Sequence, residues 1–383
     1  MEWYKGQYHI SKTEVKDIQI INIFDRMLKP IFYISVLLAV LQSCSPSDKE
    51  RKSLLPMSSG ELTEMVLLTD AASLDSAYKL EIESVFCKSI IGQPPPGEPM
   101  FKVLFTDESF FKGYFRKHLN IIVLIHRDKA QNLKKVISEN LINKILEVQS
   151  SKPGILGVKQ SELYAQNQNI FFVLADSKKD MQSKLKAKKD EILAIAIRQE
   201  NEAGKRKILG TKRAKQDVFY QKSIAKRGFG VRKPASYRVA IDNDEFAWLR
   251  KSSTTQEKEM GILLFEAPYV NKDDLTTENL LKIRNSYTKK YIPGQYDSSY
   301  MKYSTVLPPV RINQNFKSKY GVEINGWWDV EGDFMGGPSY IRAVVDEKNA
   351  RIVFAEGFLF FPNEDKAKSL RELKILVNTL SIK

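Results

Sequence analysis

The feature that most constrains how this chain can fold is an uncharged run near its beginning. The twelve residues from Pro30 to Leu41 contain no charged side chain, and Arg26 and Lys29 precede them. A helix needs about 20 apolar residues to cross a bilayer, so this run is too short to span one but has the length of a signal-peptide core. The run closes on Leu41-Gln42-Ser43-Cys44. We therefore expect residues 27–43 to be a signal peptide and the globular fold to begin after Cys44.

The end of this run resembles a bacterial lipobox, in which an aliphatic, a polar and a small residue precede an acylated cysteine. This interpretation predicts that Cys44 is the lipidation site and attaches the protein to a lipid bilayer. Anchoring by more than one acyl chain is stable. A short buried strand with a chance cysteine is the alternative. The sequence after Cys44 lacks an Asp at the second mature position and has only a partial acidic run. We therefore expect a lipid anchor in the outer membrane, facing the periplasm.

The segments on either side of the signal peptide are interpreted from their composition. Residues 1–26 contain Glu2, Glu14, Asp17 and Asp25 ahead of the signal, so we interpret them as an over-extended gene start, with Met27 as the true start. A genuine cytoplasmic leader is the alternative. Residues 44–60 are polar and contain Pro and Gly, which predicts a tether between the membrane and the folded body.

The 340 residues from Cys44 onward exceed the usual size of one domain, so we expect two α+β domains. The first would cover residues 61–203. Its apolar runs predict strands at 62–69, 101–106, 120–125, 158–165 and 169–175. Its helices are expected within 70–91, from Asp107 to 117, and over 177–203 with Ser177 as the N-cap.

The second domain would cover residues 234–383, after a basic bridge at 204–233. Its expected strands are 237–242, 246–251, 261–267, 320–330, 339–345 and 352–361. Helices are expected over 277–291 and 365–380. The fold class is therefore α+β, with two sandwich-like domains. The second would be an antiparallel sheet with helices on one face.

Several blocks of the sequence carry a resemblance to a known family. They are LLPMSSGELTEMVLLTD, FAWLR with GILLFEAPY, KKYIPG, WWDVEGDFMGGP and VVDEKNARIVFAEGFLFFP. Together they resemble a Bacteroidota lipoprotein family, domain of unknown function 4837, over about residues 54–382. The resemblance implies an anchored envelope protein whose family has no assigned activity. The order of elements in the second half also resembles the Mog1/PsbP-type sandwich, which is analogy alone.

The block from Trp327 to Pro338 contains the residues that look most like a functional site. On an extended strand its carboxylates would share one face, which suits either a hard cation such as calcium or an acid/base pair. A wide, solvated hairpin is the plainer interpretation, with Gly336 and Gly337 at positive φ. The candidate partner surface consists of Trp327, Trp328, Asp329, Glu331, Asp333, Phe334 and Met335.

Positive charge is concentrated in the bridge. Residues 204–233 contain eleven Lys or Arg and one Asp, within a chain whose net charge is +14. Export disfavours nucleic acid as a partner, so anionic lipid or envelope proteins are the expected partners. A solvated linker is the alternative. The candidate anion-binding residues are Lys205, Arg206, Lys207, Lys212, Arg213, Lys215, Lys226 and Arg227.

The sequence contains no pattern for catalysis, so we predict no catalytic residue, metal or cofactor. Cys87 lies on an apolar helical face, where a cysteine is usually a small buried residue. No histidine stands close in sequence to a Ser/Asp pair, as a nucleophile motif would suggest. We therefore expect a non-catalytic binding or assembly component of the cell envelope. The alternative is an envelope hydrolase or lipid-handling enzyme that uses Asp329, Glu331 or Asp333.

Overall fold

The computed structural model describes residues 48–152, 154–210, 217–316 and 318–383. The predicted signal peptide, Cys44 and three predicted anion-binding residues (Lys212, Arg213 and Lys215) lie outside these ranges. Residues 48–383 form one compact unit. We call residues 54–209 the first lobe and residues 217–383 the second lobe. Among the described helices, none combines the length and the apolar character that crossing a bilayer requires.

The first lobe is built on a five-stranded sheet that is mostly parallel. In spatial order its strands are β2 (Lys102–Thr106), β1 (Glu64–Leu68), β3 (Asn120–His126), β5 (Asn169–Ala175) and β4 (Gly157–Ser161). The first four run parallel, and β4 pairs antiparallel with β5 at the edge. Strands β3 and β5 are buried along their whole length, which explains their continuous apolar sequences.

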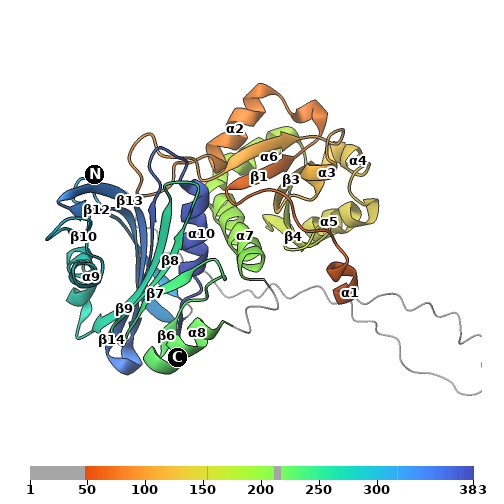
Figure 1. Ribbon diagram of the computed structural model, residues 1–383. Helices are drawn as coiled ribbons and strands as arrows, with labels where there is room; N and C mark the ends of the chain where they lie inside the picture. Colours follow the sequence, from red (N-terminus) through yellow and green to blue (C-terminus); the bar gives the residue numbers. More distant parts are fainter. Residues whose placement is uncertain (1–47, 153, 211–216, 317) are drawn as a thin grey trace, which may run out of the picture. The chain divides into compact units, whose positions relative to one another are not determined.

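Helices cover both faces of this sheet. On one face lie α2 (Ser76–Phe86), α6 (Lys178–Ala187) and α7 (Lys189–Leu209). On the other lie α4 (Ala130–Leu133) and α5 (Glu139–Ser151). Alternate residues of β1 supply the two cores, with Met65 facing α2 and Val66 facing α5. Figure 1 shows the sheet of this lobe with its helices labelled.

Two helical expectations for the first lobe need correction, and two helices were not predicted. The helix predicted from Asp107 is only α3 (Gly113–Arg116), because the Asp107 side chain accepts a hydrogen bond from Ser109 N and forms a turn instead. The helix predicted over 177–203 is two helices that meet at Lys188. Helices α4 and α5 have no counterpart in the prediction. Ser177 does cap α6, as predicted.

The second lobe contains an antiparallel sheet of eight strands. In spatial order seven of them are β10 (Tyr300–Tyr303), β12 (Lys319–Glu331), β13 (Asp333–Asp346), β14 (Arg351–Phe360), β9 (Glu259–Pro268), β8 (Phe246–Ser252) and β7 (Arg238–Asp242). The eighth, β11 (Val310–Phe316), pairs with the first half of β12. Helix α8 (Val218–Arg227) precedes a small sheet of β6 (Phe229–Gly230) and β15 (Ser381–Ile382). The α+β fold class is confirmed.

Helices lie on both faces of the second sheet, whereas the sequence predicted one face. Helix α9 (Thr277–Tyr291) packs on a core that includes Phe265 and Phe354. Helix α10 (Ala367–Val377) packs on the opposite core, with Leu264 and Val353. Figure 1 shows the two helices on either side of the sheet. Both faces of the central strands are therefore apolar, because each face packs against a helix.

The two lobes share buried contacts. Ile90, from the loop that follows α2, belongs to the core beneath α10. The Glu98 side chain of the same loop accepts hydrogen bonds from Lys366 N at 2.7 Å and Ala367 N at 2.6 Å, at the start of α10. A first-lobe residue therefore caps a second-lobe helix. The boundary predicted at residue 203 falls inside α7.

The predicted tether is structured at its end. Helix α1 covers Asp48–Ser53, and the following residues pack on the first lobe. Ser58 is buried, while Ser59 N donates to Lys117 O and Leu119 N donates to Ser59 O, both at 2.9 Å. The chain is thus held against the sheet before β1 begins.

Candidate functional site

The candidate partner surface forms the end of the β12–β13 hairpin. Val330 pairs with Asp333, so Glu331 and Gly332 form a tight turn, in which Gly332 has φ 80°. The register shifts between Asp329 and Val330, which is a β-bulge. The hairpin is therefore tight and bulged, not wide as the sequence suggested.

The positive φ predicted for Gly336 and Gly337 is wrong, because the turn places that conformation at Gly332. The two glycines are required for a different reason. A Cβ on Gly337 would lie 1.9 Å from the Leu359 carbonyl oxygen, and one on Gly336 would lie 2.8 Å from the Trp328 oxygen. Close approach of neighbouring strands, and not a turn, explains these glycines.

The two tryptophans have different environments. Trp328 is buried, packs edge-on against Phe358 and donates its Nε1 hydrogen to Leu359 O at 3.1 Å. Trp327 is half-buried. Beyond them, Phe334 is fully exposed, with 106% of its reference area, while Met335 packs partly against the core beneath α9. Phe334 therefore projects into solvent at the end of the hairpin, and the buried Trp328 anchors the strands beneath it.

The three carboxylates of this block do not converge. Glu331 forms an ion pair with Lys302, and Asp333 accepts a hydrogen bond from Phe334 N at 2.7 Å. Asp329 is half-buried on β12. Among the described residues, no group of three or more His, Cys, Asp and Glu side chains is placed to hold a metal ion. The arrangement suits a charged rim around Phe334 better than a metal or acid/base site.

The described anion-binding candidates lie at two places. Lys205, Arg206 and Lys207 are at the end of α7, where Lys207 donates to Gly60 O at 2.7 Å and Arg206 donates to Asn167 O at 3.2 Å. Lys205 is exposed.

The other two candidates are at the end of α8. Lys226 pairs with the exposed Asp244 at 2.9 Å. Arg227 is buried and pairs with Asp242. Arg227 therefore serves the fold, whereas the α7 group remains at the surface.

A buried polar cluster that the sequence analysis missed lies at the carboxyl ends of β1 and β3. Its members are Asp70, Ser73, Tyr78, His126 and Lys129. Nδ1 of His126 lies 2.7 Å from Asp70 Oδ2 and 3.2 Å from Ser73 Oγ, and Nε2 lies 3.1 Å from the Tyr78 hydroxyl. Lys129 Nζ donates to Ser73 Oγ at 3.1 Å.

This position is a topological switch point of the parallel sheet. The chain leaves β1 toward α2 on one face and leaves β3 toward α4 on the other. In open α/β sheets, ligands bind at the carboxyl ends of two such neighbouring strands. The cluster therefore occupies the place where a ligand site would be expected.

The geometry of the cluster is not that of a catalytic triad. In a triad, serine and aspartate engage opposite nitrogens of the histidine. Here Ser73 and Asp70 face the same nitrogen, and the Tyr78 hydroxyl occupies the other. Ser73 also donates its hydroxyl hydrogen to Asp70 at 2.9 Å and is completely buried. The cluster is therefore a structural network that joins the ends of β1 and β3.

The network favours the charged form of its carboxylate. Burial alone would raise the pKa of Asp70, but hydrogen bonds from His126 and Ser73 hold that pKa below its usual value. The sequence places no histidine close to a Ser/Asp pair, yet the fold brings His126 to Asp70 and to Ser73, which is 53 positions away. The available signal was that Ser73 follows β1 and His126 ends β3, and parallel strands end at one edge of the sheet.

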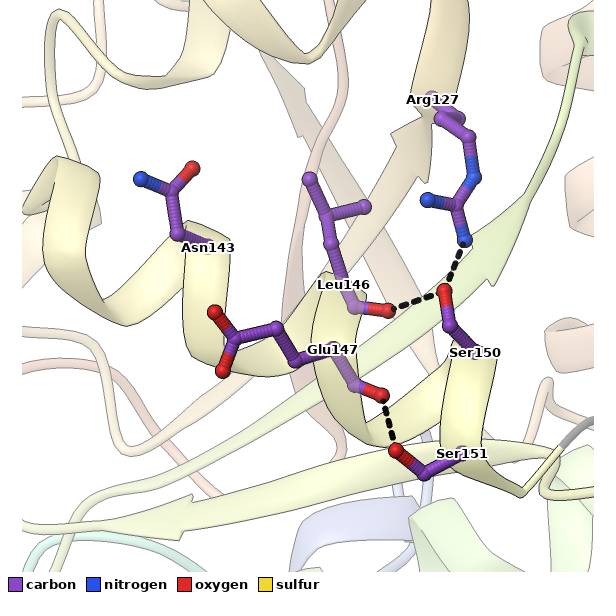
Figure 2. Close-up of a pocket in the computed structure, with 6 residues that line it drawn as sticks. All are labelled: Arg127, Asn143, Leu146, Glu147, Ser150 and Ser151. Atoms are coloured by element: carbon purple, nitrogen blue, oxygen red, sulfur yellow. Dashed lines mark hydrogen bonds between the residues drawn. The ribbon is translucent and has the colours of Figure 1, made fainter.

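A shallow depression of about 400 Å³ lies next to this edge. Its lining residues are Arg127, Asn143, Leu146, Glu147, Ser150 and Ser151 (Figure 2). Arg127 donates to Asp176 at 3.0 Å, and the two serine hydroxyls donate to backbone carbonyls of α5. The arginine and both serines of the depression are thus engaged within the protein.

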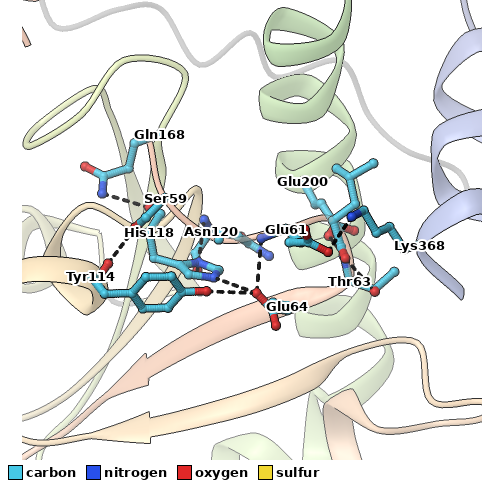
Figure 3. Close-up of polar contacts among 12 residues, drawn as sticks. Ser59, Glu61, Thr63, Glu64, Tyr114, His118, Asn120, Gln168, Glu200 and Lys368 are labelled. Carbon is cyan, nitrogen blue, oxygen red and sulfur yellow. Dashed lines mark hydrogen bonds and ion pairs between the residues drawn. The ribbon is translucent and has the colours of Figure 1, made fainter. Parts of the chain in front are cut away.

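A second polar group lies at the opposite edge of the sheet, before β1 and β3 (Figure 3). Glu64 accepts hydrogen bonds from Tyr114 at 3.0 Å and Glu61 N at 3.1 Å, and its carboxylate lies 3.7 Å from His118 Nε2. Burial lowers the pKa of His118, so this ring is neutral near pH 7. His118 packs against Gly60, where a Cβ would lie 2.0 Å from the ring.

The same edge meets the second lobe through Glu200 of α7. Glu200 is completely buried, accepts a hydrogen bond from Thr63 N, and lies 2.8 Å from Arg371 of α10. Burial raises the pKa of Glu200 despite the neighbouring guanidinium. Cys87, at the end of α2, is a free and half-buried thiol whose pKa is raised by burial, so it is not an activated nucleophile.

The comparisons with known proteins match the two lobes separately. Residues 217–379 match the family model described as Domain of unknown function (DUF4837), and residues 58–208 match a second, Domain of unknown function (DUF8532). The expected match of the first family over residues 54–382 is therefore corrected, since it covers the second lobe alone. No curated protein matches the chain in sequence.

Three solved structures show only a weak likeness. A point mutant of the protein Mog1 is 8% identical, with 40% of this chain and 90% of that chain covered and a TM-score of 0.25. LpqN of Mycobacterium tuberculosis, involved in cell envelope biogenesis, is 10% identical over 40% and 83%, also at 0.25. Human StAR-related lipid transfer protein 5 is 10% identical over 48% and 93%, at 0.23. Scores this low support no argument, and the chain is best described by its two matching domains of unknown function.

Proposed function

We propose that this protein is a lipid-anchored component of the bacterial cell envelope that binds a partner protein and has no catalytic role. In this proposal Cys44 is acylated, the anchor lies in the outer membrane, and the body faces the periplasm. The support for the anchor is the short uncharged run that ends in Leu41-Gln42-Ser43-Cys44. In the same proposal the protein belongs to the lipoproteins of Bacteroidota that the quoted sequence blocks resemble.

The observation that carries the binding role is the complete exposure of Phe334 at the end of the β12–β13 hairpin. The hairpin base is held by the Trp328 hydrogen bond and by the close strand contact at Gly337. Large aromatic side chains on a rigid support are favoured at the centres of protein interfaces, because little conformational entropy is lost when they bind.

The charges beside Phe334 define the partner that would fit. Glu331 and Asp333 stand within three positions of Phe334 at the turn, and Asp329 lies at the bulge. Lys302 pairs with Glu331, so these four side chains together remain net acidic. An acidic rim disfavours insertion of the ring into an anionic membrane. We propose a partner protein with an apolar socket surrounded by basic side chains. The same placement on an exposed turn favours docking over an enzyme that uses these carboxylates.

Replacing Phe334 with Ser tests the docking role. The protein is crosslinked in the native envelope and its partners are identified by mass spectrometry. Recovery of one partner should fall by about tenfold or more, as for an interface anchor. The matched control is Val270→Ser, since Val270 is also exposed (81%) but lies after β9, outside the hairpin. A partner lost equally in both variants, or in neither, contradicts the proposal, and recovery of the chain itself would indicate self-association instead.

The anchor has its own test. Replacing Cys44 with Ser should abolish labelling with a palmitate analogue and release the protein from membranes. Membrane retention of an unlabelled, uncleaved chain would contradict the anchoring. The start at Met27 is checked by mapping the amino terminus of the precursor when signal peptidase is inhibited.

A further inference from the structure

The order of strands in the first lobe brings several distant segments to one edge. Strands β1, β3 and β5 run parallel, so the residues that precede them all lie at the amino-terminal edge of the sheet. These are the end of the tether at 54–60, helix α3 at 113–116 and the loop at 162–168. The contacts agree, because the Gln166 side chain donates to Leu55 O and the Gln168 side chain donates to Arg116 O.

Helix α7 ends at the same edge. Asn169, the first residue of β5, donates to Gln199 O, and α7 continues for ten residues beyond that point to Leu209. Lys207 donates to Gly60 O, four positions before β1 begins. The exposed part of the basic bridge and the end of the tether are therefore neighbours in space, although about 150 positions separate them in the sequence.

The exposed charge of this edge is mainly positive. Its exposed basic residues are Arg51, Lys52, Lys112, Arg116, Lys117, Lys205 and Lys207. The acidic residues of the same edge are largely engaged within the protein. Glu64 binds Tyr114, Glu61 pairs with Lys368, and Glu202 pairs with Lys159. Asp48 and Glu50 offset part of the charge of α1 in the sequence.

Apolar side chains accompany these charges. Leu54 is 78% exposed and Met57 is 59% exposed, both on the end of the tether, and Tyr114 of α3 is 47% exposed. Basic side chains around exposed Leu, Met and Tyr are the composition of surfaces that lie on anionic lipid headgroups.

The length of chain ahead of the structure limits where this edge can be. Cys44 precedes helix α1 by four residues, and the helix spans six residues. An extended residue covers at most about 3.6 Å and a helical one about 1.5 Å, so Leu54 lies within about 30 Å of Cys44. If Cys44 is held in a bilayer, the amino-terminal edge is held near the headgroups.

We propose that the amino-terminal edge of the first-lobe sheet, formed by α1, α3 and the end of α7, lies on an anionic lipid bilayer. This inference rests on the proposed anchor at Cys44. It goes beyond that anchor by assigning the face of the protein that contacts the headgroups, and by leaving the hairpin end of the second lobe for a protein partner.

The test measures binding of residues 45–383, which contain the whole compact unit, to vesicles at low salt. Vesicles with phosphatidylglycerol should bind the protein, and vesicles of phosphatidylcholine alone should not. The edge variant replaces Lys112, Lys117 and Lys205 with Gln, all of them exposed. The control variant replaces Lys272, Lys282 and Lys348 with Gln, which are exposed on the second lobe, so both lose the same charge.

The edge variant should bind anionic vesicles about tenfold or more weakly, while the control changes by less than about threefold. Equal losses in both variants, or no binding of the parent protein to anionic vesicles, would overturn the inference. Labelling of Cys44 in cells is scored separately. If Cys44 is not labelled but the edge variant still binds vesicles more weakly than the control, the anchor is wrong and the edge assignment stands. If Cys44 is labelled but the edge variant binds vesicles as well as the parent, the edge assignment alone is wrong.

Discussion

The two edges of the first-lobe sheet are built in opposite ways. At the carboxyl edge, Asp70, Ser73 and His126 are at most 1% exposed and are joined by hydrogen bonds to one another. At the amino-terminal edge, the tether carries the exposed Lys52, and the exposed Lys112 and Lys117 flank α3. A parallel sheet usually binds its ligand at the carboxyl edge. Here the protein's own side chains fill that edge. The sheet topology creates a possible ligand site, but the side chains at the strand ends determine whether a ligand can enter it.

The same contrast recurs in the protonation of two buried carboxylates. The pKa of Asp70 is lowered because His126 and Ser73 bind its charged form. The pKa of Glu200, at the amino-terminal edge, is raised because burial outweighs the attraction of Arg371. The carboxyl edge therefore favours the charged form of its carboxylate, whereas the amino-terminal edge disfavours it.

The largest expected effect comes from opening the closed edge. Asp70→Asn removes the buried carboxylate that binds Ser73 and His126 and lies 3.8 Å from Lys129 Nζ. It should lower the free energy of unfolding by about 3 kcal/mol, as loss of a buried, hydrogen-bonded charge does. Denaturant unfolding measures it. Ser73→Ala, which removes one hydroxyl from the same cluster, should cost about 1 kcal/mol. Equal and small losses in both would mean that the network does not hold the edge together.

The hairpin of the second lobe offers the same contrast between a close contact and exposed charge. Gly337→Ala places a Cβ against Leu359 O and should lower the free energy of unfolding by about 2 kcal/mol.

Replacing Asp329 with Asn, Glu331 with Gln and Asp333 with Asn should change the free energy of unfolding by less than about 0.5 kcal/mol. Melting curves with and without millimolar calcium measure both, and calcium should leave the melting temperature nearly unchanged. A rise of several degrees, lost in the triple variant, would show a cation site.

The pH dependence separates the two carboxylates by sign. Because the folded pKa of Asp70 is lowered, its stabilisation is present above the unfolded pKa near about 3.9 and is lost as the pH falls through the folded value. Because the folded pKa of Glu200 is raised, stability falls as the pH rises from about 4.3 through its folded value. Glu200→Gln should therefore gain stability relative to the parent as the pH rises above about 4.3, measured by denaturant unfolding over a pH series. A constant difference across that range would contradict it.

The smallest expected effect on stability belongs to the open edge. The Lys112, Lys117 and Lys205 to Gln variant should change the free energy of unfolding by less than about 0.5 kcal/mol, because these side chains are exposed. Its melting temperature should equal that of the control variant. A large loss would show that the lysines serve the fold and would explain weaker vesicle binding without a membrane-facing edge.

Local sequence was a good guide wherever one segment decides its own structure. The cap at Ser177 was predictable because its side chain binds the backbone of the same turn. Strands β3 and β5 were predictable because their sequences are nearly all apolar and every residue is buried. Helix α5, whose Ile142 and Ile145 face the core, was missed.

The sequence alone determined the α+β class, most strand positions and the uncharged run before Cys44, since each depends on residues close together in the chain. Tertiary structure decided the rest. The meeting of Ser73 with His126, and of Lys207 with Gly60, depends on which strands are neighbours and in which direction they run. The glycines at 336 and 337 were assigned to a turn. Gly337 is instead required because Leu359 O, on a strand some 20 positions later, leaves no room for a Cβ. Contacts of this kind are set by packing between segments, and no pattern within one segment encodes them.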